Sequence, residues 1–248
     1  MTLDIKRSWL WQQYGPGLGL DPFDRGRYPT MQMALNLLEN RFSTGALIVE
    51  TGCQREPNDI GAGCSTEIFS KYSTCTGGHM VSIDNSAIHI SRARKFVKNY
   101  PAISFIEGDS AAILRNWSSA QKTAIQPIPE HWQDKHIDLL YLDSWDYPYV
   151  ELLKLYGYDH DEKESIKQLH SLSNEEIINK HSDIILPCQQ HTVNELDAAW
   201  HLLDGRSIIM IDDNTLPGGG KPRLAKEWLK DKGWYCLLDF HQTLWIKE

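Results

Sequence analysis

Two segments of the sequence place acidic and amide side chains directly after apolar runs. Asp143 follows the run 137–142 (IDLLYL), while Asp213 and Asn214 come shortly after the run 208–211 (IIMI). If these runs are neighbouring parallel strands, their carboxyl ends meet at one edge of a sheet and the three side chains converge there. Two carboxylates and an amide oxygen are hard ligands that suit Mg²⁺ or another hard divalent ion.

A second interpretation is that these acids only cap loops and bind water. Facing carboxylates without a cation repel one another, so this interpretation requires Asp143, Asp212 and Asp213 to be spread apart or protonated. Asp212 could also replace Asp213 as a ligand if the strand ends one residue earlier.

A glycine-containing loop follows an earlier apolar run at 46–50 (ALIVE). Gly52 comes almost directly after the run, and Gly61 and Gly63 lie farther along, before Ser65. Glycine after a buried strand lets the backbone turn sharply and approach a ligand that a side chain would exclude. Ser65 could cap the helix that follows.

Acidic residues also end the first three predicted strands. Glu50 ends the first strand, Asp84 ends the second, and Asp109 with Ser110 follows the third. A carboxylate at the position of Asp84 can accept two hydrogen bonds from a ribose diol, although it could also cap the next helix. Three acids at successive strand ends predict a nucleoside-binding crevice.

The elements that position these residues alternate between short apolar runs and amphipathic helical stretches, which is typical of a parallel sheet with helices on both faces. Besides the runs above, 80–84 and 103–106 read as strands. The last two predicted strands, 234–240 and 243–246, are separated by only two residues and must form an antiparallel hairpin. We therefore predict an α/β fold, a Rossmann-like doubly wound sheet of mostly parallel strands ending in an antiparallel hairpin.

Five parallel strands closed by such a hairpin resemble the class I S-adenosylmethionine-dependent methyltransferases. The D-x-W motif at Asp143 and the D-N motif at Asp213 resemble the metal-dependent catechol O-methyltransferase-like group, and the likeness covers about residues 46–248. It implies Asp143, Asp213 and Asn214 as Mg²⁺ ligands and Trp145 packed on the adenine. It implies S-adenosyl-L-methionine as cofactor, bound by Glu50, Gly52, Gly61, Gly63, Ser65, Asp84, Asp109, Ser110, Asp143 and Trp145.

The chain departs from this pattern at the residue that would act as base. Asp146 stands three residues after the first predicted metal ligand, where the relatives have a lysine. Because a bound cation lowers the pKa of an acceptor hydroxyl, a weaker base such as Asp146 can suffice. His191 is the other candidate, since imidazole titrates near neutrality, although a lone histidine is more often a surface or capping residue.

The predicted function is divalent-metal-assisted O-methylation of a small-molecule hydroxyl, on a sugar or natural product. A metal-independent O- or N-methyltransferase and a non-catalytic nucleoside-binding module are the alternatives. Segment 218–223 (GGGKPR) follows the second acidic motif, and its Lys221 and Arg223 could hold an anionic acceptor or the cofactor carboxylate, or could belong to a plain surface turn.

The sequence divides into an extension and one larger domain. Residues 1–45 form a predicted N-terminal helical and loop extension, and residues 46–248 form the methyltransferase domain, with a helical insertion at about 151–186 that could seal a homodimer. The net charge of −8 argues against a nucleic-acid partner. No apolar run suits a signal peptide or a bilayer span, so a cytoplasmic location without membrane contact is expected.

Overall fold

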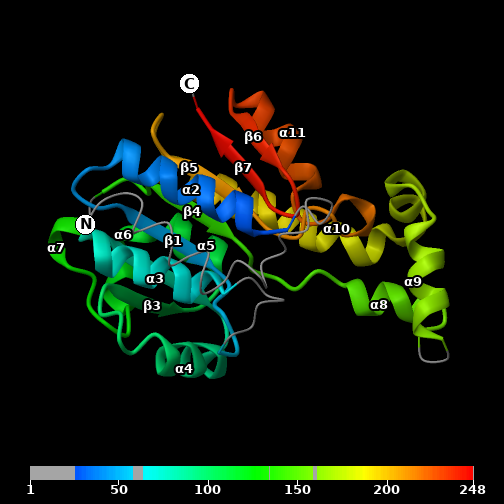
Figure 1. The fold of residues 1–248 in the computed structure, drawn as a ribbon, viewed down its shortest axis with the longest axis horizontal. Coiled ribbons are helices and arrows are strands. Elements are labelled where there is room, and N and C mark those ends of the chain that lie inside the picture. The colour runs from blue at the N-terminus through cyan, green and yellow to red at the C-terminus, as the bar shows by residue number, and fades with distance from the viewer. Residues whose placement is uncertain (1–25, 58–63, 134, 159–160, 248) are drawn as a thin grey trace.

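The computed structural model describes residues 26–57, 64–133, 135–158 and 161–247 (Figure 1). One seven-stranded sheet runs through the molecule. Its strands are β1 (Leu47–Thr51), β2 (His79–Asp84), β3 (Ile103–Glu107), β4 (Leu139–Leu142), β5 (Ile208–Ile211), β6 (Tyr235–Asp239) and β7 (Thr243–Ile246). Their order across the sheet is β3-β2-β1-β4-β5-β7-β6.

The strand pairing confirms the predicted fold class. Strands β1 to β5 are parallel to one another, whereas β7 is antiparallel to both β5 and β6. The strand order reverses between β1 and β4, which lie side by side at the centre of the sheet. The carboxyl ends of strands at such a reversal border a crevice, which is where ligands bind in open α/β sheets.

Helices cover both faces of the sheet because its central strands are apolar on both sides. Along β4, Leu139 and Tyr141 pack against one face cluster and Leu140 and Leu142 against the other. The first face is covered by α2 (Tyr28–Arg41), α3 (Ser65–Thr76) and α4 (Ala87–Phe96). The second is covered by α5 (Ser110–Arg115), α6 (Trp117–Ala120), α7 (Glu130–Gln133), α11 (Arg223–Asp231) and the C-terminal half of α10 (Asn174–Ala199).

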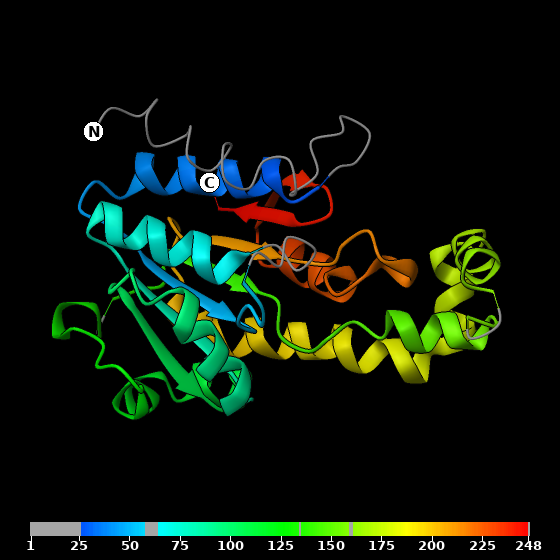
Figure 2. The same ribbon diagram turned by 60° about the horizontal axis from the view of Figure 1, so that its bottom comes forward.

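A helical arm extends beyond the sheet (Figures 1 and 2). It consists of α8 (Tyr149–Leu155), α9 (Glu162–His170) and the N-terminal half of α10. The arm has a small apolar core of its own, built from Tyr147, Leu152, Leu153, Leu169, Ile177, Ile185 and Cys188. Helix α10 departs from helical geometry at His181 and then continues back to the sheet, so it connects the arm to the main core. Among the described residues, none of the helices combines the length and apolar character needed to cross a bilayer.

Candidate functional site

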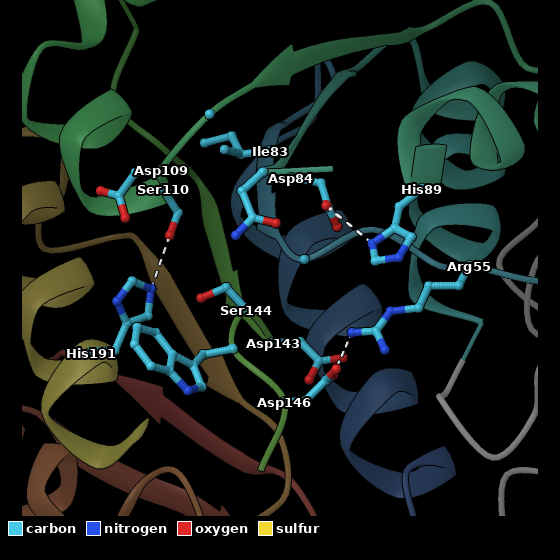
Figure 3. A pocket seen from close by; sticks show the side chains of 14 residues that line it. Arg55, Ile83, Asp84, His89, Asp109, Ser110, Asp143, Ser144, Asp146 and His191 are labelled. Atoms are coloured by element: carbon cyan, nitrogen blue, oxygen red, sulfur yellow. Dashed lines mark hydrogen bonds and ion pairs between the residues drawn. The ribbon is translucent and has the colours of Figure 1, made fainter. Parts of the chain in front are cut away.

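A first cavity of about 350 Å³ lies at the carboxyl ends of β1 to β4. Figure 3 shows Asp109, Ser110 and His191 on one side of it and Asp84, His89 and Arg55 on the other. Eight of the predicted site residues line this cavity: Gly52, Asp84, Asp109, Ser110, Asp143, Trp145, Asp146 and His191. The segments that carry them are far apart in sequence, so the predicted convergence at one edge of the sheet is realised for this set.

Gly52 allows the backbone to pass close to β4. Its φ is +81°, and a Cβ on it would lie 2.5 Å from the carbonyl oxygen of Asp143. Any larger residue would therefore push the first loop away from Asp143, which is the physical reason for glycine at this turn.

Asp84 is held rigidly at the end of β2, with its side chain only 7% exposed. One carboxylate oxygen accepts from the backbone N–H of Cys53 at 3.0 Å, and the other accepts from the backbone N–H of Ser86 at 2.8 Å. His89 Nδ1 lies 3.3 Å from the second oxygen. A carboxylate oxygen can accept more than one hydrogen bond, so Asp84 keeps capacity for a ligand hydroxyl in the cavity.

A buried glutamate that the sequence analysis missed organises the opposite wall. Glu195, 1% exposed, accepts hydrogen bonds from Ser110 Oγ at 2.5 Å and Ser144 Oγ at 2.6 Å, and its carboxylate lies 3.6 Å from His191 Nε2. Burial acts to lower the pKa of His191, but the hydrogen bond and charge of Glu195 outweigh it and raise that pKa.

Asp109 has a local role here as the N-cap of α5, accepting from the backbone N–H of Ala112 at 2.8 Å.

Trp145 is an exposed aromatic residue at the rim of the first cavity. Its side chain is 55% exposed, and its φ of +57° is rare for a residue other than glycine. Its ring lies 5.1 Å from the His191 ring, at an interplanar angle of 46°. The predicted adenine contact of Trp145 stays a prediction, and its place on the cavity wall is compatible with it.

Glu50 lies behind the cavity rather than on its wall. It is fully buried and accepts hydrogen bonds from Ser65, Thr66 and Ser82. Burial raises its pKa to about 7, although the three hydroxyls act to lower it. The hydroxyl of Ser65 thus donates to Glu50 instead of capping the helix. Helix α3 begins after Cys64 without a side-chain cap, so the predicted capping role of Ser65 is wrong. Gly61 and Gly63 lie outside the described residues.

A second cavity, of about 510 Å³, adjoins the first. The two share Gly52, Arg55, Asp143 and Asp146. The remaining wall of the second cavity comes from Arg27, Cys53, Gln54, Ser65, Tyr147, Tyr149, Val150, Glu151, Asp213, Leu216 and Lys221. This wall combines aromatic, amide and charged side chains from the first loop, the arm and the segment after β5.

Lys221 connects two of the predicted metal ligands. Its ammonium lies 2.6 Å from Asp143 Oδ1 and 2.9 Å from Asp213 Oδ2, and its side chain is only 3% exposed. Burial acts to lower the pKa of Lys221, but the carboxylates of Asp143, Asp213 and Asp212 outweigh it and raise that pKa, so the ammonium stays charged.

Asp212 faces the core instead of the cavity. It is fully buried and accepts from Arg27 Nε at 2.9 Å, from the Tyr141 hydroxyl at 2.7 Å and from the backbone N–H of Asp213 at 2.8 Å. Burial acts to raise its pKa, but Arg27 outweighs this effect and the pKa of Asp212 is lowered. Asp213 lines the second cavity and Asp212 does not, so Asp212 serves to anchor Arg27, which is part of the cavity wall.

The third predicted ligand, Asn214, points to the β6–β7 hairpin. Its amide Nδ2 donates to Asp239 Oδ1 at 2.7 Å and to the carbonyl of Phe240, and it lines neither cavity. The structure therefore brings Asp143 and Asp213 together but leaves Asn214 apart from them.

These residues, as arranged, do not fit a divalent ion. The point between the Asp143 and Asp213 carboxylates is taken by the Lys221 ammonium. Asp212, Asp213 and His241 do offer ligand atoms within 4.8 Å of one another, but both carboxylates already pair with Arg27 or Lys221. Mg²⁺ requires close octahedral oxygen ligation, which these engaged oxygens do not provide.

The two candidate bases occupy different positions. Asp146 lines both cavities, is 71% exposed and is hydrogen-bonded by Arg55. Burial acts to raise the pKa of Asp146, but Arg55 outweighs it and lowers the pKa. His191 lines only the first cavity, on the side of Ser110. Of the two residues, Asp146 alone borders both cavities.

No protein-family model and no curated protein matches the sequence. Solved structures do match. The apo structure of CalS11, a TDP-rhamnose 3'-O-methyltransferase of calicheamicin biosynthesis, superposes with a TM-score of 0.54 and 11% identity, covering 97% of this chain and 86% of that chain. The chain has the class I methyltransferase fold.

Two further solved structures are more distant. The O-methyltransferase NovP has a TM-score of 0.49 and 10% identity, covering 89% of this chain and 80% of that chain. The N-methyltransferase NodS from Bradyrhizobium japonicum WM9 has a TM-score of 0.47 and 12% identity, covering 92% of this chain and 99% of that chain. At these identities the likeness concerns the fold.

Proposed function

We propose that this chain is an S-adenosylmethionine-dependent methyltransferase that acts on a hydroxyl group of a small polar molecule. The observation that carries the proposal is the pair of adjoining cavities at the strand-order reversal, which share Gly52, Arg55, Asp143 and Asp146. Two ligands bound side by side would meet at these residues, and holding two reactants in contact is the main requirement of group transfer.

The first cavity suits the nucleoside part of the cofactor. Asp84 would accept from the ribose hydroxyls, and Asp109 and Ser110 would border the adenine. The close backbone approach at Gly52 leaves room beside Asp143. When bound, S-adenosylmethionine would supply an electrophilic methyl group carried on a sulfonium.

The second cavity suits the acceptor. Its tyrosines, amide and charged groups favour a polar molecule such as a sugar or a hydroxylated natural product. CalS11 is described as acting on TDP-rhamnose, which is the same class of acceptor. We propose a small molecule instead of a nucleic acid because the chain carries a net charge of −8.

The bound cofactor would supply a methyl group whose carbon–sulfur bonding pair stays on sulfur, and the acceptor hydroxyl would lose its proton as the new carbon–oxygen bond forms. Asp146, at the junction of the cavities, would accept that proton and release it to solvent. Its pKa is lowered by Arg55, so proton transfer to it becomes favourable only as the methyl group bonds to the oxygen and acidifies the hydroxyl.

The test is transfer of a labelled methyl group to a panel of sugar nucleotides and hydroxylated aromatics, with and without EDTA. We expect labelled product in both conditions. Loss of all product in EDTA would support the metal-assisted mechanism, and cofactor binding without transfer to any acceptor would support the non-catalytic module.

A further inference from the structure

The loop that carries Lys221 is built to hold that side chain in one place. Gly218, Gly219 and Gly220 all have positive φ, and a Cβ on Gly220 would lie 1.8 Å from the carbonyl oxygen of Asp213. Only glycine lets the loop pass this close to the end of β5. The segment before Lys221 is thus pressed against the residue that its ammonium contacts.

Side chains from α10 and from the segment between β4 and α8 fix the same loop. Gln189 of α10, fully buried, donates from Nε2 to the carbonyl oxygens of Gly218 at 3.1 Å and Gly220 at 3.0 Å. The Tyr147 hydroxyl donates to the carbonyl of Pro217. A plain surface turn has no need of a buried amide clamp, so the surface-turn interpretation of 218–223 does not describe Lys221.

The ammonium of Lys221 retains capacity toward the second cavity. Two short contacts join it to Asp143 Oδ1 and Asp213 Oδ2, while its contact with the Asp143 carbonyl oxygen is longer, at 3.4 Å. An ammonium has three protons, so one of them lacks a short partner among the described residues. Lys221 also forms part of the wall of the second cavity.

We propose that Lys221 is the cation of this site: its ammonium takes the position between Asp143 and Asp213 that a divalent ion would otherwise occupy, and it binds the acceptor oxygen. This inference rests on the proposed function for the identity of the acceptor, but the position of the cation does not depend on it. An ammonium between two carboxylates removes their mutual repulsion, so Asp143 and Asp213 can lie close together without a metal ion.

The proposal predicts the metal affinity of the protein directly. In the wild-type chain a divalent ion must displace a buried ammonium from two carboxylates, and we expect no stoichiometric Mn²⁺ binding. In K221A no ammonium separates the carboxylates of Asp143 and Asp213, although Arg27 remains 3.4 Å from Asp213 Oδ1, and we expect the variant to bind one Mn²⁺ per chain. K230A removes the same charge from an exposed position on α11 and should behave like the wild type.

The measurement is a Mn²⁺ titration followed by electron paramagnetic resonance, which reports free Mn²⁺ without any turnover. Gain of one site in K221A, lost again in the K221A/D213N double variant, supports the proposal. One Mn²⁺ site in the wild-type chain that D213N abolishes overturns it. The wild-type titration can overturn the proposal without the variant, so the experiment stays informative even if K221A fails to fold.

Kinetics provide the second readout once an acceptor is known. For K221A, kcat/KM for the acceptor should fall about 100-fold while S-adenosylhomocysteine affinity stays within a few-fold of the wild type. Unchanged acceptor kinetics in K221A would contradict the proposal. Absence of S-adenosylhomocysteine binding would instead contradict the proposed function. The Mn²⁺ titration would then still test whether Lys221 takes the place of a metal ion.

Discussion

The two cavities are constructed in different ways. In the first, Asp84 is held by backbone N–H groups of Cys53 and Ser86, one of them two residues away in sequence. In the second, the acids after β4 and β5 are held by Lys221 and Arg27, which lie 78 and 185 residues from their partners. Asp84 on the cofactor side therefore depends on backbone donors, and the acids on the acceptor side depend on buried ion pairs with cations far away in the sequence.

This difference has an energetic consequence. Backbone hydrogen bonds to Asp84 leave no unpaired charge when a neighbour is changed. The buried pairs of Lys221 and Arg27 behave otherwise, because removing one partner leaves a buried charge without compensation. Substitutions on the acceptor side should consequently affect both folding and activity, whereas those on the cofactor side should mainly affect binding.

The largest effect is expected from G220A. Its Cβ would overlap the carbonyl oxygen of Asp213 and its φ of +61° is strained for alanine, so Lys221 and Asp213 must separate. We expect the free energy of unfolding to fall by about 3 kcal/mol, measured by urea denaturation, and acceptor turnover to be lost.

G205A is the matched control for this change, since no atom lies within 4 Å of the added Cβ. It should change the free energy of unfolding by less than about 0.5 kcal/mol. Wild-type stability and turnover in G220A would show that the acceptor side does not depend on this close approach.

On the cofactor side, D84A should weaken S-adenosylhomocysteine binding about 100-fold in calorimetry, because a charged acceptor of the ribose hydroxyls is lost. E107Q is the control: Glu107 lies opposite Asp84 in the β2–β3 pairing but is exposed, and this variant should bind S-adenosylhomocysteine like the wild type. Equal S-adenosylhomocysteine affinities for D84A and the wild type would show that Asp84 does not bind the cofactor.

A smaller effect, on the pH dependence of the free energy of unfolding, is expected when Glu50 is replaced. Its folded-state pKa of about 7 lies above the unfolded value of 4.5, so its stabilising contribution is complete below pH 4.5 and is lost as the pH rises through about 7. E50Q imitates the protonated carboxyl and should remove this decline, worth about 2 kcal/mol between about pH 5 and pH 7.5. Thermal unfolding across this pH range measures the difference.

E227Q, which alters an exposed carboxyl on α11, should follow the wild-type pH profile. A wild-type profile for E50Q as well would mean that Glu50 is ionised in the folded protein at neutral pH.

The same contrast explains what the sequence could predict. The strands, the hairpin and the residues that end each strand follow from apolar runs and short spacings, and Gly52, Asp84, Asp109 and Ser110 were found in this way. Neither Arg27 nor Glu195 carries a local signal, because their roles come from partners on distant elements.

The metal prediction shows the limit most clearly. A cation relieves the repulsion between acids at neighbouring strand ends, but the sequence pattern does not specify whether that cation is a metal ion or a side chain. The three glycines before Lys221 indicate a possible anion contact, but only the folded loop places its ammonium beside Asp143 and Asp213. Asn214 was misplaced because the chain turns toward the hairpin one residue after Asp213.

We expect a cofactor in the first cavity to face an acceptor in the second across Gly52 and Asp143. A crystal structure of the chain with S-adenosylhomocysteine tests it most directly. The ribose should lie on Asp84, the adenine beside Asp109 and Ser110, and the sulfur at the junction with the second cavity. A nucleoside bound elsewhere, or a sulfur turned away from Asp143 and Lys221, would contradict this arrangement of cofactor and acceptor.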